Sequence, residues 1–534
     1  MSYPHLPLFA LLLLINVPLI SAGPLVNATV DLGYAQYQGF TDPASNNTNF
    51  LGIRYAASPT GSFRWEKPQT PPKIAGVQMA DAQPQMCLQG SFGEAPTDPF
   101  VAQKRAISQS EDCLFLNVYV PANLRQNTKS RPVVVWIHGG GYVIGSASGY
   151  TGSDIYNGND LIKESGGEAV VVVLQYRLGL FGFLSGSKVK AGGALNAGLL
   201  DQQFALQWVQ DHISLFGGDP NQVTIWGESA GAGSVLMHMI ANSGQTHPPL
   251  FKSAITSSLY VASQYQFNDT VPEAVYTEVV TKTGCSGISD TLACLRNSSV
   301  DALVAANVNI SASNFYGTFS MVPVVDGAFI TQRPSEAIRS GKLNGKALLS
   351  VTNAFEGTIL VNPNTTDVSF FLSQLFPRLG PKGIAAAAAQ YAGLGTPSFQ
   401  AAAIMGEAVI ICPTHSLLSA FKGPTYKGEF AIGSAVHGAD TAYYFPSSNP
   451  TGAPPYNNTA FDTAFAGSFL HFAVAGSPSG DKAWRSWDRG SKVEMLFNST
   501  DGLAGEPVVH PITTSAALLA RCQFWDGVSA LTVQ

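Results

Sequence analysis

The pentapeptide Gly-Glu-Ser-Ala-Gly at residues 227–231 constrains the fold of this chain more than any other feature. The apolar run Val-Thr-Ile-Trp precedes it, and small residues that suit the start of a helix follow it. In such a strand–turn–helix the serine occupies a turn so sharp that its neighbours two residues away must lack a Cβ. The helix N-terminus behind the turn favours negative charge. We therefore predict that Ser229 is a nucleophile, the alternative being a plain glycine-rich turn.

Strand and helix patterns alternate around this motif. Residues 132–138 and 169–176 contain continuous apolar runs, as buried parallel strands do, and apolar residues recur at helical spacing over residues 196–216. Further predicted strands lie at 347–351 and 428–434, and further helices at 334–341 and 461–476. The order strand, helix, strand implies parallel pairing through crossovers. We predict an α/β fold with a mostly parallel, twisted sheet between two helical layers, after a small N-terminal β segment.

A second glycine run, from His138 to Gly141, follows the first predicted strand. A phosphate-binding P-loop is excluded because no Gly-Lys-Ser/Thr follows it. Glycines let backbone N–H groups approach an oxygen that becomes negative in a tetrahedral intermediate, and one such donor contributes about 3–4 kcal/mol. We expect the N–H groups of Gly140, Gly141 and Ala230 to form an oxyanion hole.

The general base must be one of six histidines downstream of Ser229, because nucleophile, acid and histidine follow in that chain order in such a fold. His437 lies in a loop directly after a predicted strand, and Gly438 gives that loop freedom, so we predict that it is the base. The alternative is an exposed loop histidine. Five others lie in less suitable contexts: His238 on the nucleophile's own helix, His247 before two prolines, His415 at a helix start, His471 in an apolar helical run as an expected core residue, and His510 before a proline.

The acid that orients the base is predicted to be Glu356. It follows the carboxyl end of a predicted strand and precedes a glycine. The rival is Asp326, which lies in a turn-like context before its strand. A carboxylate in this position holds the imidazole and stabilises its cation.

These segments resemble the type-B carboxylesterase/lipase family, which includes the cholinesterases and some fungal lipases. Other matching runs lie at residues 50–65, 111–121, 176–184, 201–208 and 322–327. The family places its triad glutamate in an Asn-x-x-Glu-Gly segment and its histidine before a glycine, as at Glu356 and His437. The resemblance implies the α/β-hydrolase fold and hydrolysis of small-molecule carboxylic esters through an acyl-enzyme, with no metal or organic cofactor.

The six cysteines show no metal-ligand spacing, and their pairing stays open on arithmetic alone. The resemblance implies the disulfides Cys87–Cys113, Cys285–Cys294 and Cys412–Cys522, and an ion pair between Arg64 and Glu111. It also places Ser257 and Glu228 beside the triad. Thr256-Ser257-Ser258 replaces the usual Gln-Ser-Gly of the family, so the acyl-pocket geometry departs from the family pattern there.

Export is predicted from the N-terminus and from the sequons. Residues 1–22 contain an apolar run that ends near small residues, as in a secretory signal peptide. The alternative is a buried N-terminal helix. Residues 23–534 would then form a single domain of a secreted, extracellular protein. An even number of cysteines suits an oxidising compartment. Asn-x-Ser/Thr sequons predict glycosylation at Asn27, Asn46, Asn268, Asn297, Asn309, Asn364, Asn457 and Asn498.

Charge and loop composition narrow the function further. A formal net charge of −6 gives no basic footprint for nucleic acid, and we expect no membrane span after the leader. Residues 88–112 contain no tryptophan, which argues against a choline site, and no long amphipathic helix. We therefore predict a carboxylesterase. The alternatives are an interfacial lipase for triglycerides or sterol esters and a non-catalytic, cholinesterase-like adhesion protein. The natural ester and the oligomeric state stay open.

Overall fold

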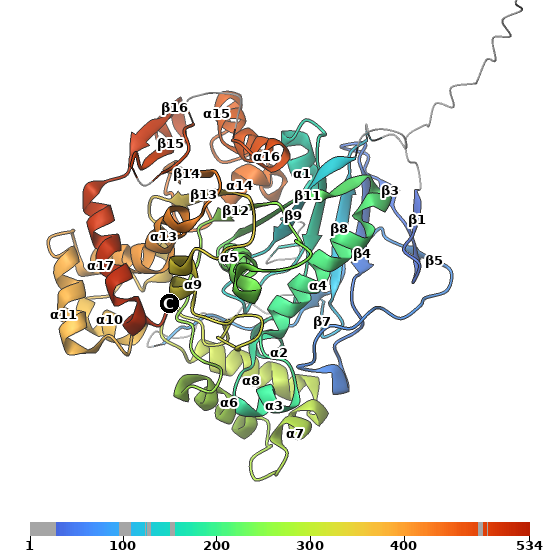
Figure 1. The fold of residues 1–534 in the computed structure, drawn as a ribbon, viewed down its shortest axis with the longest axis horizontal. Helices are drawn as coiled ribbons and strands as arrows, with labels where there is room; N and C mark the ends of the chain where they lie inside the picture. The colour runs from blue at the N-terminus through green and yellow to red at the C-terminus, as the bar shows by residue number, and fades with distance from the viewer. Residues whose placement is uncertain are drawn as a thin grey trace, which may run out of the picture.

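The computed structural model describes residues 28–95, 108–122, 124, 130–149, 155–478, 484–488 and 490–534. Within them, one large twisted sheet runs through the molecule with helices on both faces (Figure 1). Its eleven strands, in spatial order, are β16 (Ala504–Thr513), β15 (Val493–Asp501), β14 (Thr425–Phe430), β13 (Ala347–Asn353), β12 (Ser253–Ser257), β11 (Gly218–Glu228), β9 (Arg131–Ile137), β10 (Val170–Leu174), β8 (Phe115–Val120), β4 (Thr48–Arg54) and β3 (Phe40–Thr41).

The central strands pair in parallel and the outer strands pair antiparallel. All neighbours from β15 across to β10 are parallel, whereas β16 and the strands from β8 to β3 pair antiparallel. Parallel strands point their carboxyl ends to the same edge of a sheet. The loops after β9, β11, β13 and β14 therefore meet at one edge, and these loops carry the predicted site residues.

Two apolar cores lie on the two faces of this sheet. Along β9, the side chains of Val133, Val135 and Ile137 belong to one core. Those of Val134 and Trp136 belong to the other. Because successive side chains of a strand point to opposite faces, the continuous apolar run in the sequence fills both cores.

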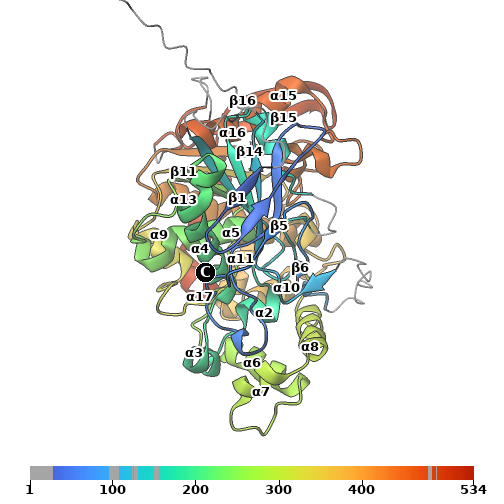
Figure 2. The same cartoon turned by 90° about the vertical axis from the view of Figure 1, so that its right-hand side faces the viewer.

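Helices α4 (Ala197–His212) and α5 (Ala230–Gly244) cover one face, and α1 (Gly158–Glu164) and α16 (Ala466–Ala475) cover the other. The remaining α-helices are α2 (Gly179–Phe183), α3 (Ser187–Gly192), α6 (Thr270–Lys282), α7 (Thr291–Asn297), α8 (Val300–Ala312), α9 (Pro334–Ser340), α10 (Val368–Leu375), α11 (Gly380–Tyr391), α12 (Pro397–Gly406), α13 (Cys412–Ala420), α14 (Thr441–Tyr444), α15 (Thr459–Ala464) and α17 (Ala516–Thr532). Helices α6, α7 and α8 gather at one end of the molecule in both views (Figure 1, Figure 2).

A small N-terminal sheet lies beside the large one, in front in Figure 2. It consists of β1 (Thr29–Asp31), β2 (Gln36–Gln38) and β5 (Val77–Met79). A further two-stranded sheet joins β6 (Met86–Cys87) and β7 (Gln109–Ser110). The predicted fold class, including its N-terminal β segment, is therefore confirmed.

All three implied disulfides are present: Cys87–Cys113, Cys285–Cys294 and Cys412–Cys522. The ion pair also forms, with Nε of Arg64 2.6 Å from a carboxylate oxygen of Glu111, both side chains nearly buried. The guanidinium also donates to the carbonyl oxygens of Arg296 and Ser298. These contacts join Arg64 to the segment just before Cys113 and to the C-terminal end of α7.

Two sequence predictions on residues 461–476 need correction. The predicted single helix is interrupted at Phe465, whose ψ of −84° separates α15 from α16. His471 is exposed, and its Nδ1 lies 2.7 Å from the carbonyl oxygen of Ser477. The prediction of a core histidine was wrong because a helix with mostly apolar residues still turns one side chain per turn toward solvent.

One described helical stretch, 397–420, is long and apolar enough to cross a membrane, and 72% of its most apolar part is buried inside the protein. The predicted signal peptide, residues 1–22, and the sequon at Asn27 lie outside the described residues. Of the other sequon asparagines, Asn498 is half-buried and the rest are exposed.

Candidate active site

Ser229 lies on a sharp turn between β11 and α5. Its φ of 56° and ψ of −124° are strained for a residue with a side chain, and it is 8% exposed. A Cβ on Gly227 would lie 2.4 Å from the carbonyl carbon of Gly231. A Cβ on Gly231 would lie 2.1 Å from the carbonyl oxygen of Ile137. Both glycines of the motif are therefore required by the packing of the turn, as the sequence predicted.

Three distant side chains meet at this turn. His437, from the loop after β14, places its Nε2 2.8 Å from Oγ of Ser229. Its Nδ1 lies 2.7 Å from Oε2 of Glu356, in the loop after β13. This continuous hydrogen-bonded chain from hydroxyl to imidazole to carboxylate is the arrangement that activates a serine for nucleophilic attack. The structure thus brings together all three residues predicted for the triad.

The second oxygen of Glu356 is also held. Its Oε1 accepts hydrogen bonds from Oγ of Ser258 and from the backbone N–H of Asn353, both at 2.7 Å. The expected neighbour, Ser257, makes different contacts: its hydroxyl accepts from Nε1 of Trp226, and its carbonyl oxygen accepts from the N–H of Ser229. The side chain that contacts the acid is therefore Ser258, at the third position of the unusual Thr-Ser-Ser segment.

One carboxyl group lies near each nitrogen of the His437 imidazole. Burial lowers the pKa of His437, but the hydrogen bond and the charge of Glu356 outweigh it and raise the pKa above its ordinary value. Oε1 of Glu228 lies 3.5 Å from Nε2 of the same imidazole, so Glu228 lies beside the triad as expected. Burial raises the pKa of Glu228 to about 8.

Asp440 is a neighbour that the sequence analysis missed. It lies three residues after His437, and its Oδ1 accepts a hydrogen bond of 3.0 Å from the side chain of Asn353. Burial raises the pKa of Asp440 to about 6. A carboxylate so close in sequence to the predicted base could have drawn attention to it.

The glycine run after β9 lies opposite Ser229. The N–H groups of Gly140 and Gly141 make no hydrogen bond within the described part of the chain. Ala230 begins α5, so its N–H also lacks a partner inside the helix. A Cβ on Gly141 would lie 2.1 Å from the ring of Phe319, so only glycine fits there. The three predicted oxyanion donors are thus next to the nucleophile.

The other candidates lie elsewhere. Asp326 accepts hydrogen bonds from the side chain of Asn196 and from the N–H groups of Ala328 and Ile330, away from His437. His238 is buried in α5 with its Nε2 3.1 Å from Oε1 of Gln202. Within the described residues, no cluster of His, Cys, Asp and Glu could hold a metal ion.

The comparisons with known proteins agree with this geometry. The profile of the carboxylesterase family matches residues 26–507. This chain belongs to the carboxylesterase family. Carboxylesterase patB of Aspergillus clavatus is 31% identical to it over 98% of this chain and 100% of its own length. Secreted triacylglycerol lipase LIP1 of Gibberella zeae is 34% identical over 61% of this chain and 58% of its own length.

Solved structures show the same fold. EstA of Aspergillus niger matches this esterase with a TM-score of 0.82 and 28% identity, covering 95% of this chain and 99% of its own. The predicted family, the α/β-hydrolase fold and the class of carboxylic ester hydrolase are therefore confirmed.

The cavity at the candidate active site has a volume of about 300 Å³. Ser229, His437, Gly140 and Gly141 line one side of it. The remaining lining is mostly apolar: Phe92, Ile144, Tyr260, Phe319, Ile359 and Leu360. Such a lining suits an ester with apolar substituents.

Proposed function

We propose that this carboxylesterase is a serine esterase whose acyl-enzyme forms on Ser229. The hydrogen-bonded chain Ser229–His437–Glu356, beside unpaired N–H groups, carries the proposal. His437 accepts the hydroxyl proton as the oxygen of Ser229 attacks the ester carbonyl.

The rest of the cycle follows from the same groups. The carbonyl oxygen becomes negative and is stabilised by the N–H groups of Gly140, Gly141 and Ala230. The proton on His437 passes to the leaving alcohol, and the acyl group stays on Ser229. Water then attacks the acyl carbon and gives its proton to His437. The tetrahedral intermediate expels Ser229, which recovers the proton, and the carboxylic acid departs.

The direct test is the variant Ser229→Ala. We expect kcat for p-nitrophenyl butyrate to fall by about 10⁶-fold, because the nucleophile and its base act as one unit. Circular dichroism should show an unchanged fold. Retained activity in a folded variant would contradict the proposal, and a wild-type protein without activity would favour the non-catalytic alternative.

A lipase is the second candidate, since the cavity is largely apolar and the Gibberella zeae relative is named a triacylglycerol lipase. We propose the esterase because the cavity of about 300 Å³ is at the small end of ligand sites. Hydrolysis of p-nitrophenyl butyrate should exceed that of emulsified trioleoylglycerol. A sharp rise in rate above the solubility limit of a triglyceride would favour the lipase.

We also propose that the protein is secreted after cleavage behind Ala22, and that residues 23–534 form one domain. Several relatives are named secreted lipases, and sequons such as Asn46 and Asn297 are exposed. The large sheet takes strands from β3 to β16, nearly the full length of the chain. N-terminal sequencing of the exported protein should begin at Gly23, and unfolding should be a single transition. An intact Met1 in a protein retained by the cell would contradict the export.

A further inference from the structure

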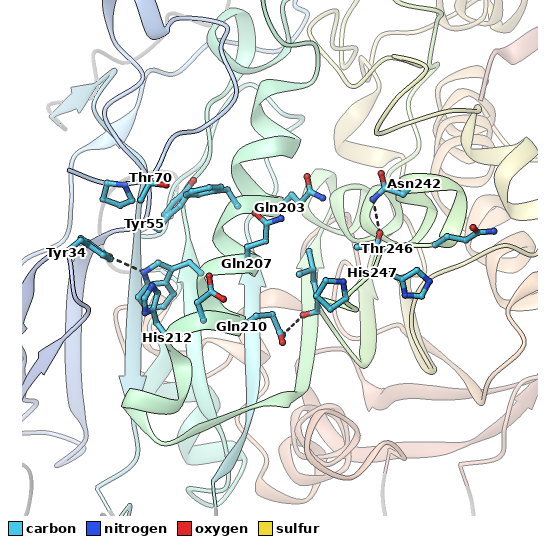
Figure 3. Close-up of a pocket in the computed structure, with 17 residues that line it drawn as sticks. Tyr34, Tyr55, Thr70, Gln203, Gln207, Gln210, His212, Asn242, Thr246 and His247 are labelled. Atoms are coloured by element: carbon cyan, nitrogen blue, oxygen red, sulfur yellow. Dashed lines mark hydrogen bonds between the residues drawn. The ribbon is translucent and has the colours of Figure 1, made fainter. Parts of the chain in front are cut away.

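A second cavity lies on the helical face of the esterase, away from the catalytic one. Its volume is about 550 Å³, within the range of ligand sites, and it shares no lining residue with the catalytic cavity. It reaches Asn242, just beyond the regular part of α5, whose other end begins directly after Ser229. Figure 3 shows α4 passing between its two walls.

Helix α4 turns glutamines into this cavity. Gln203 and Gln207 are one turn apart and lie on the same face of the helix (Figure 3). Neither side chain makes a hydrogen bond within the described residues. Gln210, one turn further, donates to the carbonyl oxygens of Pro220 and Leu250 and is fixed. Each of these two unpaired side-chain amides offers two N–H donors and one acceptor oxygen to a ligand in the cavity.

Aromatic rings also line this cavity: Tyr34 comes from the N-terminal segment, and the buried Trp208 and the partly exposed His212 come from α4 itself. Nε1 of Trp208 donates to Oη of Tyr34 at 3.0 Å, and Tyr34 in turn donates to the carbonyl oxygen of Arg54. The imidazole of His212 lies against both rings, with centroids 5.3 Å from Trp208 and 6.0 Å from Tyr34. The rings are thus held in place before any ligand arrives, so little ordering is needed on binding.

The charges of the side chains that line this cavity restrict the charge of a ligand that it can bind. The lining contains no Lys or Arg, and Asp211 is its one carboxylate. Burial lowers the pKa of His212, which favours the neutral form of this imidazole. Phosphates and carboxylates find no cation here, and a cation finds a single exposed carboxylate. A neutral ligand with many hydroxyl groups and apolar C–H faces matches the two unpaired amides and the partly exposed rings of Tyr34 and His212.

We propose that this cavity binds a neutral oligosaccharide. Its hydroxyl groups exchange hydrogen bonds with Gln203 and Gln207, and its C–H faces pack on the partly exposed rings of Tyr34 and His212. The site is independent of the acyl-transfer site, and it would hold the esterase at a carbohydrate surface while Ser229 stays accessible.

Saturation-transfer difference NMR on the full chain tests the proposal, with maltotriose, cellotriose and xylotriose as the probes. At least one trisaccharide should bind, and the double variant Gln203→Ala/Gln207→Ala should weaken its binding by about tenfold. The matched control is Gln523→Ala, an exposed helical glutamine on α17 outside the cavity, which should bind like the wild type. Hydrolysis of p-nitrophenyl butyrate should be equal in all three proteins.

Two further samples separate this site from the catalytic one. Ser229→Ala and a protein blocked by a fluorophosphonate should bind the trisaccharide as the native enzyme does. The proposal is overturned if none of the three sugars binds, if the double variant binds them as tightly as the control, or if blocking the active site abolishes binding. None of these results would bear on the esterase mechanism.

Discussion

Two glutamates flank the imidazole of His437, one in the loop after β13 and one at the end of β11, and they differ in their partners. Glu356 lies 2.7 Å from Nδ1 and also accepts hydrogen bonds from Ser258 and the backbone of Asn353. Glu228 lies 3.5 Å from Nε2 and accepts no hydrogen bond within the described residues. Burial raises the pKa of Glu228 to about 8.

The difference shows that donors, more than position, decide what a buried carboxyl group can do. Burial disfavours the charged form, and only hydrogen bonds and opposite charge compensate for it. Glu356 has both and can stabilise an imidazolium. Glu228 accepts no hydrogen bond within the described residues, and the imidazole at 3.5 Å does not outweigh its burial. It is largely uncharged at neutral pH, so it contributes shape and a weak, pH-dependent field.

Of the two glutamates, Glu356 is the one whose replacement should have the larger effect on kcat. Replacing Glu356 by Gln removes the charge and favours the wrong imidazole tautomer, so kcat for p-nitrophenyl butyrate should fall by about 10⁴-fold. The matched control, Glu228→Gln, should lose less than about tenfold, because the side chain accepts no hydrogen bond. Steady-state kinetics on both variants measures the contrast. Equal losses would show that the two carboxyl groups are not distinguished by their partners.

A smaller effect is expected at Ser258, which supplies one of the donors to Glu356. Ser258→Ala should lower kcat by about tenfold, since a hydrogen bond to a charged group is lost. Ser257→Ala is the control, because that hydroxyl contacts Trp226 instead. The acidic limb of the pH profile should also move to higher pH, because a carboxylate that loses a donor attracts the imidazolium more strongly and raises the pKa of His437. An unchanged limb would assign Ser258 a purely structural part.

The smallest expected effect is a shift in the pH dependence of kcat/KM in the variant Glu228→Gln. The imidazole must be neutral to act as a base, so the acidic limb of kcat/KM follows the pKa of His437. The charged form of Glu228 raises that pKa. Its removal should move the acidic limb to lower pH in a profile from about pH 5 to about pH 10. A limb that moves upward would mean that the carboxyl group does not act on the imidazole through its charge.

The site residues that could be predicted from the sequence are those whose positions depend on local sequence patterns. Ser229 and the oxyanion glycines directly follow strands. Their turns need backbone conformations and close contacts that only glycine permits, so glycines in the sequence indicate them. Glu356 and His437 could be predicted because strand ends of a parallel sheet meet at one edge. Ser258 and Asp440 were missed, since their contacts depend on side-chain directions that periodicity does not define. His471 was assigned wrongly for the same reason: an apolar run does not tell which side of the helix faces solvent.

The central claim is that Ser229 is the residue acylated during turnover. Peptide mapping by mass spectrometry after treatment with a fluorophosphonate tests it most directly. The account predicts one adduct per chain, on the peptide that contains Ser229, formed at a rate that falls in parallel with kcat in Glu356→Gln. Complete inactivation with the adduct on a different residue, or continued hydrolysis by a protein fully labelled at Ser229, would contradict it.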